Sequence, residues 1–297
     1  MSRGAPEEAG MILVNVLMFV AIAAGMVLLM VTREESALDR ATRLVQSSRA
    51  LAAVRGGELS AVVALRRDFA DAPDADSAAE PWAALSERAA PIAGGTFDLA
   101  IADAQDRFNI NNLRDGRADT VGQWQRIGTA AGLTPEQIIE ATALVRAFGP
   151  VTDLRPLGSA GLEPGVLQRL RMMVTALPTG TSVNMNSAGV DLLGVLLENP
   201  DAAARLVALR AREGRLTRLD VAQADVFIPN GVGFTSGYFW VRTRATLGES
   251  TQQAAALIAR RIGADGKTPE TVTVGRWRNA AIPSEAPALE PLGAPAA

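Results

Sequence analysis

The segment MILVNVLMFVAIAAGMVLLMV at residues 11–31 decides the architecture, because only Asn15 and Gly25 interrupt its apolar character. As a helix it would be about 31 Å long, which matches the roughly 30 Å hydrocarbon core of a bilayer. Arg33 follows the run closely. We therefore interpret 11–31 as a membrane-spanning helix. A cleaved secretory signal is the alternative, but its apolar part would be only about 7–15 residues long.

Helical periodicity continues beyond this span to about Phe69. Apolar residues recur every seven positions, at Leu38, Val45, Ala52 and Leu59. Arginines and acidic residues fill the opposite face, which is typical of an amphipathic helix lying on other structure. Residues 11–69 are therefore predicted to form one helix of about 88 Å, with 32–69 as its amphipathic continuation.

The rest of the chain divides into a sheet region and a helical insertion. Alternating apolar and polar residues predict four strands, at 96–102, 238–246, 252–260 and 271–274. Short turns between the last three favour an antiparallel sheet laid on the long helix. We assign 70–112 and 232–280 to the sheet region, 113–231 to the inserted helical domain and the Pro/Ala-rich 281–297 to a disordered tail.

Two short runs hint at an internal repeat within the helical region. Phe108-Asn109-Ile110-Asn111-Asn112 is echoed by Val183-Asn184-Met185-Asn186-Ser187, and each run precedes helices and a glycine turn, near Gly149 and Gly214. The pattern is similar to helix-hairpin-helix units. Chance remains the alternative, because Asn-rich and glycine-turn runs recur at many helix ends.

The N-terminus resembles that of a type IV prepilin. Residues 1–10 form a short polar leader that ends in Gly10, directly before the apolar span. The resemblance implies that a prepilin peptidase cuts between Gly10 and Met11 and that the new amine of Met11 is methylated. The leader is not basic and arginines follow the span, so the orientation with the N-terminus inside rests on the resemblance and not on the charges.

Further motifs are similar, in order and spacing, to the K-type minor pseudopilins of type II secretion (the general secretion pathway protein K family). The motif positions are Trp82, Arg107, Phe108, Asn109, Asn111, Asn112, Asn184 and Asn186. Pilins usually carry Glu at the fifth mature position, and this family lacks it; the residue here is Asn15. The resemblance implies a subunit with no neighbour above it in the membrane. An asparagine merely tolerated by helix packing is the alternative.

The resemblance implies an α+β fold, with a pilin-like long helix packed on an antiparallel sheet and a large inserted all-helical domain. It implies a single-pass protein of the bacterial inner membrane with a periplasmic C-terminal domain. The function would be that of a tip subunit that helps initiate and cap the pseudopilus for protein export across the outer membrane. Its partners would be the I-type and J-type minor pseudopilins and the major pseudopilin, with the prepilin peptidase as processing enzyme. A type IV pilus minor pilin and a membrane-tethered DNA-binding helix-hairpin-helix protein are the alternatives.

Composition argues against an enzyme and against nucleic acid. The 297 residues include no His and no Cys, and only one Lys and one Tyr, so the Ser-His-Asp and Cys-His arrangements and the usual zinc sites lack their residues. The formal net charge is −3, and residues 119–231 contain ten Arg against eleven Asp and Glu, whereas phosphate binding needs a basic face.

No metal site is predicted. Asp71, Asp74 and Asp76 are interpreted as solvated loop acids, and calcium is the one cofactor that the resemblance leaves open.

Overall fold

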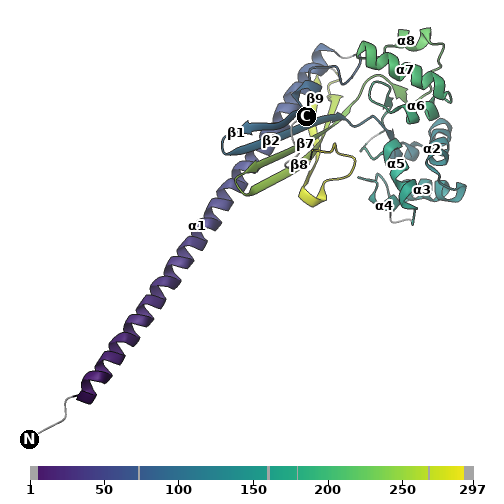
Figure 1. Ribbon diagram of the computed structural model, residues 1–297. Coiled ribbons are helices and arrows are strands. Elements are labelled where there is room, and N and C mark those ends of the chain that lie inside the picture. Colours follow the sequence, from purple (N-terminus) through teal and green to yellow (C-terminus); the bar gives the residue numbers. More distant parts are fainter. Residues whose placement is uncertain (1–5, 73, 159–160, 179, 267, 291–297) are drawn as a thin grey trace, which may run out of the picture.

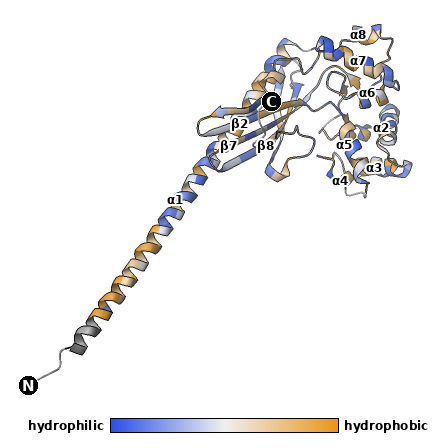
Figure 2. Cartoon of the chain, in the orientation of Figure 1, coloured by the Kyte–Doolittle hydropathy of each residue, from blue (hydrophilic) through white to orange (hydrophobic). Residues whose placement is uncertain are grey.

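A single helix dominates the molecule. The computed structural model describes residues 6–72, 74–158, 161–178, 180–266 and 268–290. Helix α1 runs from Pro6 to Asp71 and projects far from the folded part of the chain (Figure 1). Its outer half is strongly apolar and its inner half is mixed (Figure 2). The helix therefore covers both the predicted membrane span and its amphipathic continuation.

The inner half of α1 lies on a five-stranded antiparallel sheet of order β1-β2-β7-β8-β9. The strands are β1 (Glu87–Ile92), β2 (Gly95–Asp103), β7 (Tyr238–Leu247), β8 (Ser250–Ile262) and β9 (Pro269–Arg278). One apolar cluster under the helix joins Leu65 of α1 to Leu99, Phe239 and Ile258 of the sheet. Burial of such side chains contributes roughly 1.5–3 kcal/mol each, so this cluster anchors the helix on the sheet.

Gly57 sets how closely the helix approaches the sheet. A Cβ atom at this position would lie 2.5 Å from Cζ of Phe97 on β2, whereas nothing lies within 4 Å of the corresponding position at Gly56. Any larger residue there would have to displace the Phe97 ring. Although the glycine pair weakens the helix locally, α1 continues through it without interruption.

Two predictions about the sheet region are wrong. The predicted sheet had four strands and omitted β1, whose sequence contains Pro91 and a bulge between Glu87 and Ala90. Both features are tolerated at a sheet edge. The predicted disorder is wrong for 281–290, where Glu285 and Ala286 are buried and Ala286 packs with Trp240 and Leu257; 291–297 lie outside the described residues.

The helical region consists of two units of similar plan. In the first unit, β3 (Phe108–Asn109) pairs in parallel with β4 (Val174–Thr175); in the second, β5 (Val183–Asn184) pairs in parallel with β6 (Val232–Gly233). The first unit contains, between its strands, a 3-10 helix (Ile110–Asp115), α2 (Ala118–Ala131), α3 (Pro135–Phe148), α4 (Arg155–Gly158) and α5 (Pro164–Met173). The second contains α6 (Val190–Leu196), α7 (Pro200–Glu213) and α8 (Arg218–Gln223). Both share one large apolar core, and they lie beyond the sheet at the end of the molecule far from the N-terminus (Figure 1).

Candidate functional site

The outer half of α1 is the first functional element. Among its described side chains, every residue from Leu13 to Val31 is exposed, and this stretch is long and apolar enough to cross a membrane. Gly10 and Met11 lie in the helical backbone near its start, and Asn15 is exposed on its surface. An apolar helix with no protein around it requires a partner of low polarity, either lipid or other helices.

The inner half of α1 also leaves apolar side chains uncovered. Leu38 and Leu44 are each 68% exposed, and Leu59 is 62% exposed. These residues lie on faces that the sheet does not cover. The helix therefore presents apolar surface over most of its length.

In the first helical unit, two asparagines of the predicted motif form hydrogen bonds to backbone groups of neighbouring segments. Asn109 accepts from the backbone N–H of Leu177 at 3.0 Å and of Asn111 at 3.1 Å. Asn111 donates to the carbonyl of Val151 at 2.8 Å and accepts from its N–H at 2.9 Å. Both side chains are buried, so each satisfies backbone groups that water cannot reach.

In the second unit, the two equivalent asparagines repeat these roles. Asn184 accepts from the N–H of Asn186 at 2.9 Å, as Asn109 does from Asn111. Asn186 accepts from the N–H of Leu216 at 2.6 Å and donates to its carbonyl at 3.2 Å, as Asn111 does with Val151. Matching side-chain-to-backbone bonds at matching places favour a true internal repeat over chance.

The remaining motif residues join parts of the molecule. Asn112 bonds both backbone groups of Thr181. Phe108 stacks on Trp124 in the helical core, and Trp82 packs edge-on against Phe239 under α1. Arg107 donates to the carbonyls of Arg171 and Glu285, which ties the helical region to the C-terminal segment. All eight motif positions therefore have structural contacts, and the structure does not bring them into one cleft.

A buried polar cluster at the junction of α1, the sheet and the second helical unit was not predicted. Arg260 of β8 is 6% exposed and bonds the carboxylates of Asp68 and Asp76. Its guanidinium also lies over the Phe239 ring, 4.4 Å from the centroid. The interpretation of Asp76 as a solvated loop acid is wrong, because this side chain is 2% exposed. No sequence spacing links Asp68, Asp76 and Arg260; the available signal was that Arg260 directly follows the apolar run at 254–259 of β8.

Asp103, at the end of β2, is the second buried acid of this junction. Its carboxylate accepts from Ser187 at 2.5 Å, Ser236 at 2.7 Å and Asn184 at 2.8 Å. Burial raises the pKa of Asp103 to about 6, although these hydrogen bonds lower it. The carboxylate thus joins the sheet to the second helical unit without a cationic partner in the described chain.

The carboxylates near Arg260 do not fit a calcium site. Ligand oxygens of Asp68, Asp76 and Glu80 lie within 4.8 Å of one another. However, Arg260 already bonds two of them, and Glu80 accepts from Trp82 and from the N–H of Ser77. Calcium needs about six to eight oxygen ligands and would be repelled by the guanidinium. Burial raises the pKa of Asp68 and of Glu80, and the nearby carboxylates add to both shifts.

Comparisons with known proteins give one curated relative and one solved structure of note. The chain is 26% identical over 310 residues to the type II secretion system protein K of Pseudomonas aeruginosa, an alignment that covers 90% of this chain and 92% of that protein. One chain of the GspK-GspI-GspJ complex from the type 2 secretion system of enterotoxigenic Escherichia coli superposes with a TM-score of 0.61 at 18% identity, covering 81% of this chain and 99% of the other. No family model matches.

The solved structure and the curated relative test different predictions from the sequence. The solved structure shows the fold, and it confirms the predicted combination of pilin-like helix, antiparallel sheet and helical insertion. The curated relative aligns with 90% of this chain, and it confirms the predicted resemblance to the K-type pseudopilins.

Proposed function

We infer that this chain belongs to the K family of type II secretion proteins and is a minor pseudopilin of that system. The observation that carries this conclusion is α1, a single helix whose outer part is apolar and uncovered and whose inner part lies on the sheet. A curated K protein aligned over 90% of the chain supports the same assignment. The protein is anchored in the inner membrane by one span.

The folded part, from about residue 50 onward, lies on the periplasmic side. Its partners are the I-type and J-type minor pseudopilins, a proposal that the GspK-GspI-GspJ complex of the structural neighbour supports. The major pseudopilin would be a further partner within the same fibre. The uncovered apolar side chains of α1 between Leu38 and Val63 form the surface for helices of these subunits. A prepilin peptidase removes residues 1–10, and Met11 becomes the methylated N-terminus.

The subunit occupies the tip of the pseudopilus. Asn15 is uncharged, so it cannot pair with the amine of a subunit above it in the low-dielectric membrane. The two helical units extend well beyond the sheet (Figure 1), which is compatible with a position where no further subunit stacks. From this position the chain helps initiate and cap the pseudopilus.

A structural role without catalysis fits the same observations better than DNA binding does. Of the arginines around α7, Arg210 is used internally, because it donates to the carbonyls of Met185 and Ala188. Arg210 is therefore not available to bind DNA phosphates, as the arginines of a helix-hairpin-helix protein would be.

The processing step tests this proposal directly. The mass of the N-terminal peptide is measured for the protein purified from cells with and without the prepilin peptidase. We expect a methylated Met11 that depends on the peptidase. An intact Met1 in both strains, or a cut near residue 31, would contradict the pseudopilin assignment.

A further inference from the structure

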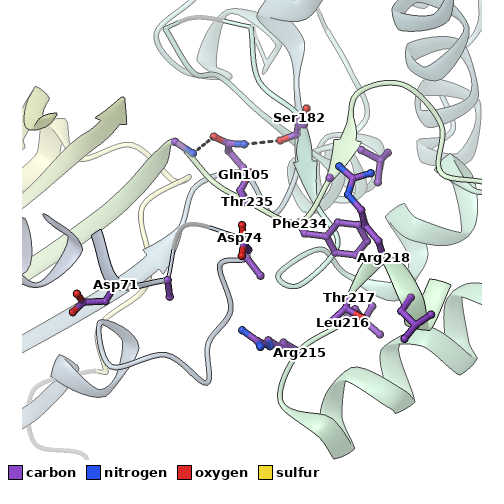
Figure 3. Close-up of a pocket in the computed structure, with 16 residues that line it drawn as sticks. Asp71, Asp74, Gln105, Ser182, Arg215, Leu216, Thr217, Arg218, Phe234 and Thr235 are labelled. Atoms are coloured by element: carbon purple, nitrogen blue, oxygen red, sulfur yellow. Dashed lines mark hydrogen bonds between the residues drawn. The ribbon is translucent and has the colours of Figure 1, made fainter. Parts of the chain in front are cut away.

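A large cleft lies between the end of α1 and the second helical unit. Its volume is about 910 Å³. One side is formed by Asp71, the last residue of α1, and by Asp74; the other side is formed by Arg215 and Arg218 at the turn between α7 and α8. In Figure 3 Asp71 lies to the left, Asp74 near the centre with Arg215 below it, and Arg218 to the right.

The charged residues on the two sides form no ion pairs within the described part of the chain. Among the described residues, none of Asp71, Asp74, Arg215 and Arg218 takes part in an ion pair. Acidic and basic groups therefore both line the cleft without neutralising one another in an ion pair. A ligand that carries both a carboxylate and a cation would pair with both sides.

The cleft also offers apolar surface and a fixed base. The Arg218 guanidinium lies 5.7 Å from the centroid of the Phe234 ring, and Leu219 is 64% exposed at the rim. At the base, the buried amide of Gln105 donates to the carbonyl of Ser182 at 2.7 Å and accepts from the N–H of Gly237 at 2.6 Å. These bonds connect the start of β7 to the second helical unit, so the base of the cleft is fixed before any ligand arrives.

Size and charge together narrow the class of ligand. A volume of about 910 Å³ is at the upper end of the range for small-molecule sites and is far more than a single amino acid needs. A nucleic-acid backbone is disfavoured by Asp71 and Asp74. The cleft lies 40 residues of helix beyond Val31, or about 60 Å from the membrane span, so lipid is not within reach.

We propose that this cleft binds an extended segment of another protein that presents an acidic and a basic side chain, with an apolar residue against Leu219 and Phe234. The acidic side chain pairs with Arg215 and Arg218, and the basic one pairs with Asp71 and Asp74. The cleft lies at the end of the molecule far from the membrane, so the partner approaches from that side. The inference stands independently of the secretion role.

A fluorescence experiment on the full chain in detergent tests the proposal. The chain has no cysteine, so Thr235→Cys, at an exposed position that lines the cleft, carries an environment-sensitive dye that reports on the cleft and leaves Leu219 and Phe234 in place. The probes are synthetic peptides of about nine residues, roughly 30 Å when extended, that carry one Glu and one Arg at varied spacing, together with Glu-only and Arg-only peptides of equal length. We expect saturable binding of mixed-charge peptides, and binding at least about tenfold weaker for both single-sign sets.

Charge reversals on each side provide the decisive variants. Arg215→Glu with Arg218→Glu, and Asp71→Lys with Asp74→Lys, should each weaken the mixed-charge peptides about tenfold or more. Reversal of all four residues should restore binding, because the peptide then binds with its charges exchanged. That recovery separates a lost contact from a misfolded variant, and circular dichroism checks folding of each protein.

The matched control is Arg205→Glu with Arg212→Glu. These exposed arginines lie on α7 but outside the cleft, and their reversal should leave affinity unchanged. The proposal is overturned if no peptide binds, if the control weakens binding as much as the cleft variants do, or if an anionic oligonucleotide binds as well as the peptides.

Discussion

At the scale of single residues, Arg260 is the side chain on which the junction most depends. Its substitution by Met would leave Asp68 and Asp76 buried without their cation. Breaking a buried ion pair from one side typically costs about 3–5 kcal/mol. We expect Arg260→Met to lower the free energy of unfolding of the full chain by about this amount, measured by denaturant unfolding followed by tryptophan fluorescence.

The neighbouring arginine is the control for this prediction. Arg261 pairs with Glu270, and its side chain is 62% exposed. An exposed pair of this kind contributes about 0–1 kcal/mol. If Arg261→Met destabilised the protein as much as Arg260→Met, burial of the cluster would not be the cause.

Asp103 makes the stability of the chain depend on pH. Because burial raises its pKa in the folded protein to about 6 from 3.8, the folded state binds the proton more tightly than the unfolded state. The stabilisation is fully present below about pH 3.8 and is lost as the pH rises through about 6. A shift of this size corresponds to roughly 3 kcal/mol.

The measurement is the free energy of unfolding between pH 4.5 and pH 8, compared for the natural chain and Asp103→Asn. The free energy of unfolding should fall less steeply with rising pH in Asp103→Asn than in the natural chain, because an amide does not titrate. Asp39→Asn, at an exposed position on α1, should keep the natural slope. An unchanged slope in Asp103→Asn would assign the pH dependence to other groups.

At the scale of elements, α1 depends on the different surroundings of its two adjacent glycines. Gly57→Ala would place a Cβ against the Phe97 ring, and overpacking of this kind typically costs about 1–3 kcal/mol. Gly56→Ala meets nothing within 4 Å and should stabilise the helix by about 0.5–1 kcal/mol. Thermal unfolding followed by circular dichroism compares the two, and a shift of the same sign in both would contradict the close approach at Gly57.

The two helical units show what a sequence pattern can and cannot predict about elements. The asparagine runs near 109 and 184 are visible in the sequence, and so are the glycine turns that follow them. The pairing of Asn111 with Val151 and of Asn186 with Leu216 is not, because the partners are 40 and 30 residues away and are backbone groups without a sequence signature. Strand β1 was missed because its edge position tolerates residues that are poor strand formers in isolation.

At the scale of the whole molecule, the membrane span is structurally separate from the folded part. Every described side chain from Leu13 to Val31 is exposed, so none of them supports the core. We expect a chain that begins at residue 32 to be water-soluble and to unfold within a few degrees of the full chain in detergent, measured by circular dichroism. Loss of the cooperative transition in the shortened chain would show that the span supports the fold.

The membrane helix, its amphipathic continuation and the general plan of sheet and helices follow from the sequence itself, because they depend on local hydrophobic periodicity. The resemblance carried by the motif residues likewise required no structure. Only the tertiary structure decided that Arg260, Asp68, Asp76 and Asp103 meet in one buried junction. It also decided that 281–290 cover the sheet and that a cleft with opposite charges lies beyond α1. These features arise where segments distant in the chain come together, and the energy of a buried charge or a close contact depends on that neighbourhood and not on the residue type alone.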